Sequence, residues 1–97
     1  MYARVSTAAV QPGKMDEIIA VSRESGLPAA QQQRGFKSAL WLTDRDANKL
    51  MAVTLWETKE EMEASEQSGY YREQIGRLGG LIAGDVVREA YEVSIQG

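Results

Sequence analysis

The stretch FKSALWLTDRDANKLMAVTLWE, residues 36–57, contains two apolar segments separated by a polar one. Phe36–Thr43 and Leu50–Glu57 are rich in aromatic, aliphatic and β-branched residues, and four of the six residues between them are charged. This pattern is typical of two antiparallel strands joined by a hairpin loop longer than two residues. The sequence therefore predicts a β-hairpin in the middle of the chain.

Alternation sorts the side chains of this hairpin into two sets if Thr43 lies opposite Leu50. One face then carries Phe36 and the large aliphatic residues: Phe36, Leu40, Leu42, Met51, Val53 and Leu55. The other face carries both tryptophans and smaller residues: Ala39, Trp41, Ala52, Thr54 and Trp56. We prefer this register because it gathers the large aliphatics, although the loop also allows a slip of one residue.

The segments around the hairpin have recognisable patterns of their own. Tyr2–Val10 and Val86–Ile95 alternate in side-chain character, which predicts two more strands. A helix is expected after Pro12-Gly13, with one narrow buried face: Met15, Ile18, Ile19, Ser22 and Gly26. Leu27-Pro28 predicts its end, and residues 29–34 allow one more helical turn.

Two helices are predicted between the hairpin and the last strand. Thr58 and Glu61 form a capping box at the start of a helix over Lys59–Ser65. Ser68 is the expected cap of a longer helix, Tyr70–Ala83. The order β-α-β-β-α-β then predicts a ferredoxin-like α+β fold for a single domain, residues 1–97. Its four-stranded antiparallel sheet has the first and third strands in the middle and its helices on one face.

Composition excludes several classes of site. The chain has 97 residues, of which 43% are hydrophobic and 26% charged, with no cysteine, no histidine and a formal charge of −3. Disulfides, thiolate-bound zinc, Ser-His-Asp triads and histidine-bound haem are therefore impossible. The acidic balance disfavours nucleic acid. Without a signal peptide or an apolar run of roughly 20 residues, we expect a cytoplasmic protein with no membrane segment.

One face of the predicted sheet is left without helices. We expect this open face to carry Trp41 and Trp56, and two exposed tryptophans would form a patch typical of an interface. Pairing of two such faces would bury the patch, so the sequence predicts a homodimer.

Four features give the chain a family resemblance. They are the segment Pro12-Gly13-Lys14-Met15-Asp16-Glu17, the strand opening Gly35-Phe36-Lys37-Ser38-Ala39, the Trp56-Glu57 strand end with its acidic helix, and Ser68-Gly69-Tyr70-Tyr71. With these features the chain resembles antibiotic biosynthesis monooxygenase domains of the dimeric α+β barrel superfamily. The resemblance implies oxygen insertion into a small aromatic or polyketide-like compound, without a flavin or metal cofactor.

The chain departs from this family at one place that matters. Family members often carry a histidine on the helix after the Trp-Glu strand, whereas this helix reads Met62-Glu63-Ala64-Ser65-Glu66. Haem-degrading members also use an asparagine, and the sole asparagine here, Asn48, lies in the hairpin loop. Haem degradation is therefore not expected, and a buried carboxylate such as Glu57 or Glu89 would have to act as general base.

Three residues are our candidates for chemistry in such an enzyme. Trp56 would form a wall against a flat ring, or else fill the dimer core. The Tyr70 hydroxyl would steer a substrate phenol or donate to a peroxide, or else pack in the core. Arg88 would stabilise an oxyanion, as Arg72 also could, or remain a surface charge.

Four further residues are candidates for substrate binding: Trp41, Tyr71, Arg4 and Gly80. Arg4 lies on a central strand and needs a polar cavity or a carboxylate partner such as Glu89. Gly80 belongs to a series with Gly76 and Gly84, which would permit close approach of a strand, a partner or a flat ligand. The alternative function is a non-catalytic ligand carrier on the same dimeric scaffold, which the absence of histidine favours.

Overall fold

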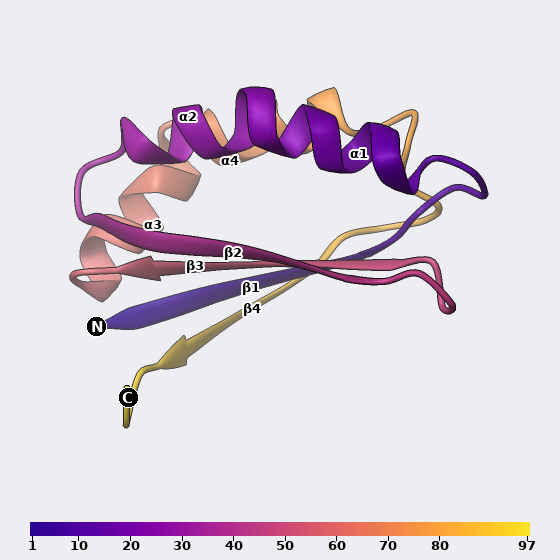
Figure 1. The fold of residues 1–97 in the computed structure, drawn as a ribbon. Coiled ribbons are helices and arrows are strands. Elements are labelled where there is room, and N and C mark those ends of the chain that lie inside the picture. Colours follow the sequence, from indigo (N-terminus) through magenta and orange to yellow (C-terminus); the bar gives the residue numbers. More distant parts are fainter.

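The computed structural model describes all 97 residues as one sheet covered by helices on one side (Figure 1). Its elements are β1 (Tyr2–Ala9), α1 (Met15–Val21), the π-helical segment η1 (Ser22–Gly26), α2 (Leu27–Gln31), β2 (Phe36–Asp44), β3 (Lys49–Trp56), α3 (Lys59–Gln67), α4 (Tyr70–Arg77) and β4 (Val87–Glu92). The strands are all antiparallel, in the order β2-β3-β1-β4. The predicted ferredoxin-like α+β fold, with the first and third strands central, is confirmed.

The register of the hairpin is the predicted one, because Thr43 pairs with Leu50 and Trp41 with Ala52. A β-bulge between Phe36 and Ser38 changes its start. The bulge adds one residue to β2, so that Phe36 lies opposite Trp56 instead of sharing a face with the aliphatic residues. The predicted face of Phe36 was therefore wrong.

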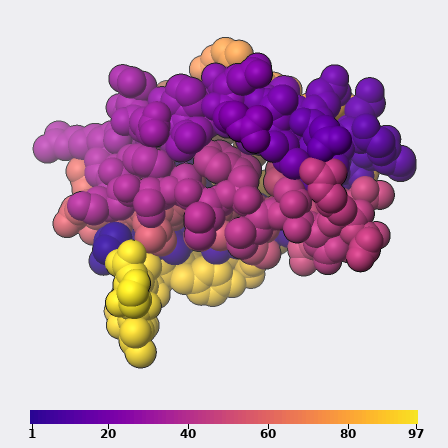
Figure 2. Space-filling model, viewed as in Figure 1, coloured from indigo at the N-terminus to yellow at the C-terminus, as the bar shows by residue number.

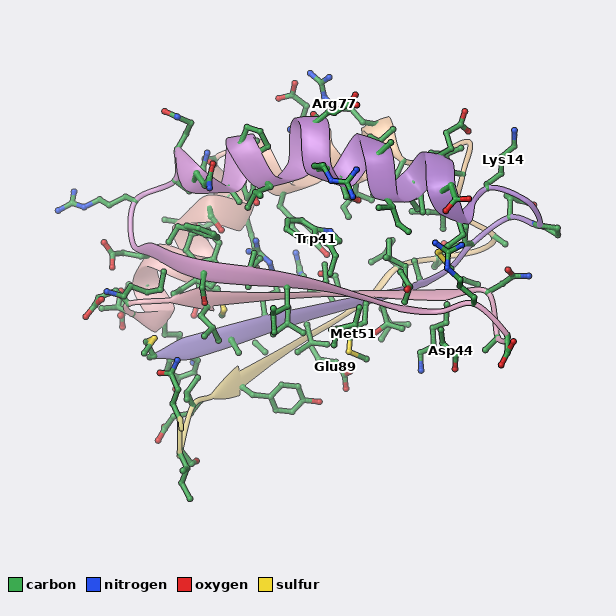
Figure 3. The ribbon with its side chains drawn as sticks, in the orientation of Figure 1. Lys14, Trp41, Asp44, Met51, Arg77 and Glu89 are labelled. Carbon is green, nitrogen blue, oxygen red and sulfur yellow. The ribbon has the colours of Figure 1, made fainter.

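The prediction of which face the helices cover was also wrong. Trp56 is completely buried on the helix side, and Trp41 points toward the helices while Met51 and Glu89 lie on the opposite face (Figure 3). The open face is the aliphatic one, where Leu40 is 61% exposed. Alternation shows which residues share a face, but both faces of this hairpin are apolar, so the pattern could not decide which of them the helices cover.

The first helix does not end at Gly26, as its Leu27-Pro28 sequence predicted. It continues through the π-helical turn of η1 into α2, and the backbone N–H of Leu27 bonds to the carbonyl of Ser22, five residues earlier. Pro28 then lies in the first turn of α2, where its missing N–H breaks no helical hydrogen bond. The result is one long helical rod above β2 (Figure 1).

The Thr58 cap is confirmed, since the Glu61 N–H donates to Thr58 Oγ1 at 3.1 Å, while the Glu61 carboxylate accepts from the Thr58 hydroxyl at 3.1 Å. The expected Ser68 cap is wrong: Ser68 ends α3, and Gly69, with a φ of 92°, precedes α4. The prediction that α4 reaches Ala83 is wrong too, because the helix stops at Arg77. The chain then pairs with the end of β1, where the Ala83 N–H donates to the carbonyl of Ala9 at 2.9 Å.

The packed core lies toward one end of the sheet. Its buried members are Ala8, Val10, Met15, Ile18, Leu50 and Ile82. The other end, near the start of β1, is occupied by Arg4 and Trp56. The residues after β4 project away from the body (Figure 2). None of the helices is both long and apolar enough to cross a bilayer.

Candidate functional site

A cavity lies between the helices and the sheet. Its volume is about 70 Å³, taken as the space that the centre of a water-sized sphere can reach, and 11 of its 17 lining residues are hydrophobic. Its walls consist of Arg4, Ser6, Ala8, Val21, Ser22, Gly26, Trp41, Leu50, Ala52, Thr54, Tyr70, Tyr71, Gln74, Ile75, Leu78, Ile82 and Val86. An apolar cavity with a few polar groups is the usual form of a small-molecule site.

Small residues on both layers explain why this space is not filled. On the sheet, Ala8 and Ala52 point toward the helices, and on the helical rod Ser22 and Gly26 face them one turn apart. A Cβ atom at Gly26 would lie 3.4 Å from Cζ2 of Trp41. The cavity therefore exists because the buried face of the helical rod carries small side chains at this point.

Arg4 forms the polar end of the cavity. Its side chain is only 2% exposed, and its Nη1 donates to Ser65 Oγ at 2.9 Å, to Glu66 Oε2 at 3.1 Å and to the carbonyl of Met62 at 3.5 Å. These three acceptors all belong to α3, which satisfies the partner requirement that the sequence imposed on this buried charge. The partner is Glu66, however, and the predicted pairing with Glu89 was wrong, because Glu89 lies on the open face.

Two aromatic rings contact the Arg4 guanidinium. Its Cζ atom is 4.5 Å from the ring centroid of Tyr71 and 5.1 Å from that of Trp56, which gives a cation–π contact with each ring. Trp56 is held in turn by an edge-to-face contact with Phe36 and by a 2.9 Å bond from its Nε1 to Thr54 Oγ1. Trp56 does not line the cavity, so it acts on the site only through its contact with the Arg4 guanidinium.

Tyr70 and Tyr71 begin α4 and both line the cavity. The Tyr71 hydroxyl is hydrogen-bonded to Ser6 Oγ at 2.7 Å. Burial raises the pKa of Tyr70, an effect that the nearby Arg4 cation partly offsets. Tyr70 therefore stays neutral near pH 7, and its hydroxyl is a proton donor.

Arg88 lies on the outer side of Tyr71. Its Cζ is 5.3 Å from the Tyr71 ring, and its Nη1 is 3.5 Å from Oε1 of Glu66, so Glu66 is held between Arg88 and Arg4. Arg88 and Arg72 line a shallow outer groove that shares Tyr71 with the cavity but do not reach the cavity itself.

The remaining residues of the sequence analysis lie elsewhere. Trp41 does line the cavity. Gly80 lies beyond the end of α4 and is not a lining residue, and no atom comes within 4 Å of a Cβ built at Gly76, Gly80 or Gly84. No strand of this chain approaches these glycines, and they do not form one helical strip because α4 ends at Arg77; the approach of a partner or a ligand stays a prediction.

Neither carboxylate suggested as a general base reaches the cavity. Glu57 is half exposed and pairs with Lys37 at 3.2 Å, and Glu89 accepts a hydrogen bond from the Tyr91 hydroxyl at 2.8 Å. The structure also brings no group of three acidic side chains close enough together to hold a metal ion. Glu66 accepts a hydrogen bond from the lining residue Arg4, and both of its oxygens face arginines.

Sequence reasoning missed the polar groups contributed by Ser22 and Gln74. Gln74 Oε1 accepts from Ser25 Oγ at 2.9 Å. Ser22 is 5% exposed, and its Oγ is the one buried side-chain oxygen or nitrogen in the chain without a hydrogen-bond partner. Leaving a buried hydroxyl unpaired costs about 1–3 kcal/mol. A serine on an otherwise apolar helical stripe was the available signal.

A family model described as antibiotic biosynthesis monooxygenase matches residues 1–76. The chain belongs to this family. Two uncharacterized proteins of Mycobacterium tuberculosis are related to it: Rv2558, 38% identical over 65 residues (67% of this chain and 28% of that protein), and Rv2557, 32% identical over 98 residues (97% and 41%). The chain thus spans less than half the length of these two relatives.

Solved structures of other proteins have the same fold. SnoaB of Streptomyces nogalater, a cofactor-independent oxygenase, superposes with a TM-score of 0.79 at 14% identity, covering 98% of this chain and 94% of SnoaB. Rv0793 of Mycobacterium tuberculosis superposes with a TM-score of 0.77 at 14% identity, covering 98% and 96%. At this level of identity the likeness shows the fold alone.

Proposed function

We propose that this member of the family is a cofactor-independent monooxygenase that acts on a small aromatic or polyketide-like compound. The observation that carries the proposal is the position of Arg4, a buried cation at the polar end of an otherwise apolar cavity. A flat ring would occupy the apolar part against Trp41, with its phenolic oxygen toward Arg4 and Tyr70.

The chemistry needs an anion of the substrate. The substrate has an acidic CH₂ group between two rings that are conjugated with a carbonyl. This group loses a proton, and the resulting carbanion transfers electrons to O₂. The peroxide formed at this carbon then loses water, so that CH₂ and O₂ become C=O and H₂O. Arg4 would stabilise the anion, and the neutral Tyr70 hydroxyl would donate a proton to the departing oxygen.

The chain offers no obvious general base in the cavity, which limits the substrates to acidic ones. Glu66 has both carboxylate oxygens engaged by arginines, and there is no histidine. A substrate that ionises readily beside the Arg4 cation would not need a base. Arg88 and Trp56 then act indirectly, by holding Glu66 and Arg4 in place.

The assembly proposed for this function is a homodimer formed through the open sheet face. This face carries Leu40, Leu42, Val87 and Tyr91, which are each about half exposed or more. Leu40 and Leu42 lie on one edge strand, β2, and Val87 and Tyr91 on the other, β4, and exposed apolar side chains on an open sheet face are typical of an interface. A cytoplasmic location stays a prediction from the sequence.

A ligand carrier without catalysis is the second candidate. The absence of a histidine base favours it, as does the engagement of Glu66 by two arginines. The carrier would use the same cavity and the same Arg4, but would release its ring compound unchanged.

Oxygen uptake separates the two functions. Purified protein is mixed with anthrone or a hydroxylated anthrone in an oxygen electrode, with no flavin or metal added. Protein-dependent uptake that falls at least tenfold in Tyr70→Phe supports the monooxygenase. Binding of these compounds without uptake supports the carrier, and absence of both rejects the cavity as a site for such rings.

A further inference from the structure

The roof of the cavity consists of two helical parts that are joined at a single point. The rod of α1, η1 and α2 and the helix α4 lie on the same face of the sheet (Figure 1), but α4 packs against α3 and has few close contacts with the rod. We call the boundary between the rod and α4 the seam. Only one hydrogen bond crosses it: Ser25 Oγ, in the π-helical turn, donates to Gln74 Oε1 at 2.9 Å.

This bond lies at the edge of the cavity. Gln74 is a lining residue and Ser25 is not, and both side chains are only partly buried. On the cavity side of the seam, the rod contributes Val21 and Gly26, and α4 contributes Ile75. The bond between Ser25 and Gln74 therefore closes the roof from its outer side.

The cavity below the seam is too small for a ring compound while the roof is closed. Its volume is about 70 Å³, whereas a cavity of about 150 Å³ is known to hold a benzene ring. Protein interiors are close-packed, so this space cannot be gained by small shifts of many side chains. A ring compound can therefore bind only if one wall of the cavity moves outward.

The other walls are held more firmly than the seam. The floor consists mainly of β1 and β3, which pair along their whole length. At the polar end, Arg4 is fixed by three hydrogen bonds to α3, and the segment after α4 is tied to the end of β1 by backbone hydrogen bonds. The first turn of α4 is anchored to the sheet by the bond between Tyr71 and Ser6. The seam is thus the wall that opens at the lowest cost.

We propose that the hydrogen bond between Ser25 and Gln74 is a latch, and that ring compounds enter the cavity when α4 separates from the rod. This inference rests on the proposed function and adds the entrance of its site and the residues that control it. A bound ring occupies space that the closed roof does not leave, so the latch is broken in the bound state as well as during entry. The latch therefore lowers the apparent affinity, because only the open fraction of the protein can bind.

The test measures how the variant Ser25→Ala binds 2-naphthol. The substitution removes the latch but changes no lining residue. A partly buried hydrogen bond changes an equilibrium by a factor of about two to ten. We expect the variant to bind 2-naphthol more tightly by this factor in calorimetry, although it melts at a lower temperature than the wild type. In stopped-flow fluorescence, association should be faster by the same factor while dissociation is unchanged.

Ser68→Ala is the matched control. It is the same substitution and also removes one partly buried hydrogen bond, from Ser68 Oγ to the carbonyl of Ser65, but this bond does not cross the seam. The control should melt at a lower temperature and bind 2-naphthol as the wild type does. A second control is Gln74→Met, which removes the latch from its other end. Adding Ser25→Ala to it should give no further gain in affinity, since the bond is already absent.

Several results would overturn the latch. They are an affinity of Ser25→Ala equal to or below that of the wild type, an equal gain in Ser68→Ala, and a further gain when Ser25→Ala is added to Gln74→Met. In each of these cases 2-naphthol still binds, so the proposed function stands without the latch. If 2-naphthol binds none of the proteins, the cavity is not a site for rings, and the latch fails together with the proposed function.

Discussion

A substitution at Gly26 would change the size of the cavity, because Gly26 is a lining residue that belongs to a helix. Its backbone angles, φ −63° and ψ −51°, are those of a right-handed helix, so an alanine introduces no backbone strain. The added Cβ would meet Cζ2 of Trp41 at 3.4 Å, an ordinary van der Waals contact. Gly26→Ala should therefore fold normally and place a methyl group in the space above Trp41.

Two effects of opposite sign are expected from this variant. Replacing a helical glycine with alanine favours folding by about 0.8–1 kcal/mol, which raises the melting temperature of a domain of this size by about 3–8 °C. The same methyl group narrows the cavity, and a misfit of one carbon in an apolar pocket weakens binding by roughly tenfold or more. The variant should thus be more stable than the wild type but bind 2-naphthol more weakly.

Gly76→Ala separates these two effects. Gly76 also lies in a helix, α4, but nothing is within 4 Å of its Cβ position and it is not a lining residue. It should gain similar stability and keep its affinity for 2-naphthol. Thermal melting and calorimetry on both variants decide the matter. Unchanged binding by Gly26→Ala would show that rings do not enter this part of the cavity, and a lower melting temperature would show that Trp41 cannot accommodate the methyl group.

Three further predictions concern the open face, the buried charge and the tyrosine. Leu40→Asp should convert a dimer into a monomer in analytical ultracentrifugation, whereas Ile95→Asp, at a 92% exposed position in the tail, should not; a monomeric wild type would contradict the dimer. Arg4→Met should lower the free energy of unfolding in urea by about 3 kcal/mol. This is the lower end of the range for a broken buried ion pair, because Glu66 keeps a second arginine partner. A loss below about 1 kcal/mol would contradict the buried network. The raised pKa of Tyr70 means that the unfolded chain ionises first as the pH rises, so folding stability should fall above about pH 10, and Tyr70→Phe should lessen that fall; identical pH profiles for the two proteins would refute this assignment.

Local features of the sequence were sufficient to predict the elements and their order. The alternation of residues 36–57 predicted the observed pairing of Thr43 with Leu50, and the Thr58 side chain caps α3 as expected. These predictions succeed because strand pairing and helix capping depend on residues close together in the chain. The family resemblance also rested on short motifs of neighbouring residues, and it was confirmed.

The helix boundaries show where local signals are overridden. Leu27-Pro28 predicted the end of the first helix, yet a π-helical turn accommodates the proline and continues the rod. In the opposite sense, the helix that starts at Tyr70 ends early because the following residues pair with the end of β1. In both places backbone hydrogen bonds decide the outcome: a local bond from Leu27 to Ser22 continues the first helix, and a bond to the distant Ala9 draws the chain after α4 onto β1.

The site itself depended on the tertiary structure. The sequence determined that a charge at Arg4 needs a partner, but only the packing of α3 against β1 selected Glu66 over Glu89. It also determined which residues share a face of the sheet, apart from Phe36, but only the placement of the helices turned Trp41 into a cavity wall. Burial and charge pairing depend on residues some 60 positions apart in the chain, and no local pattern encodes such contacts.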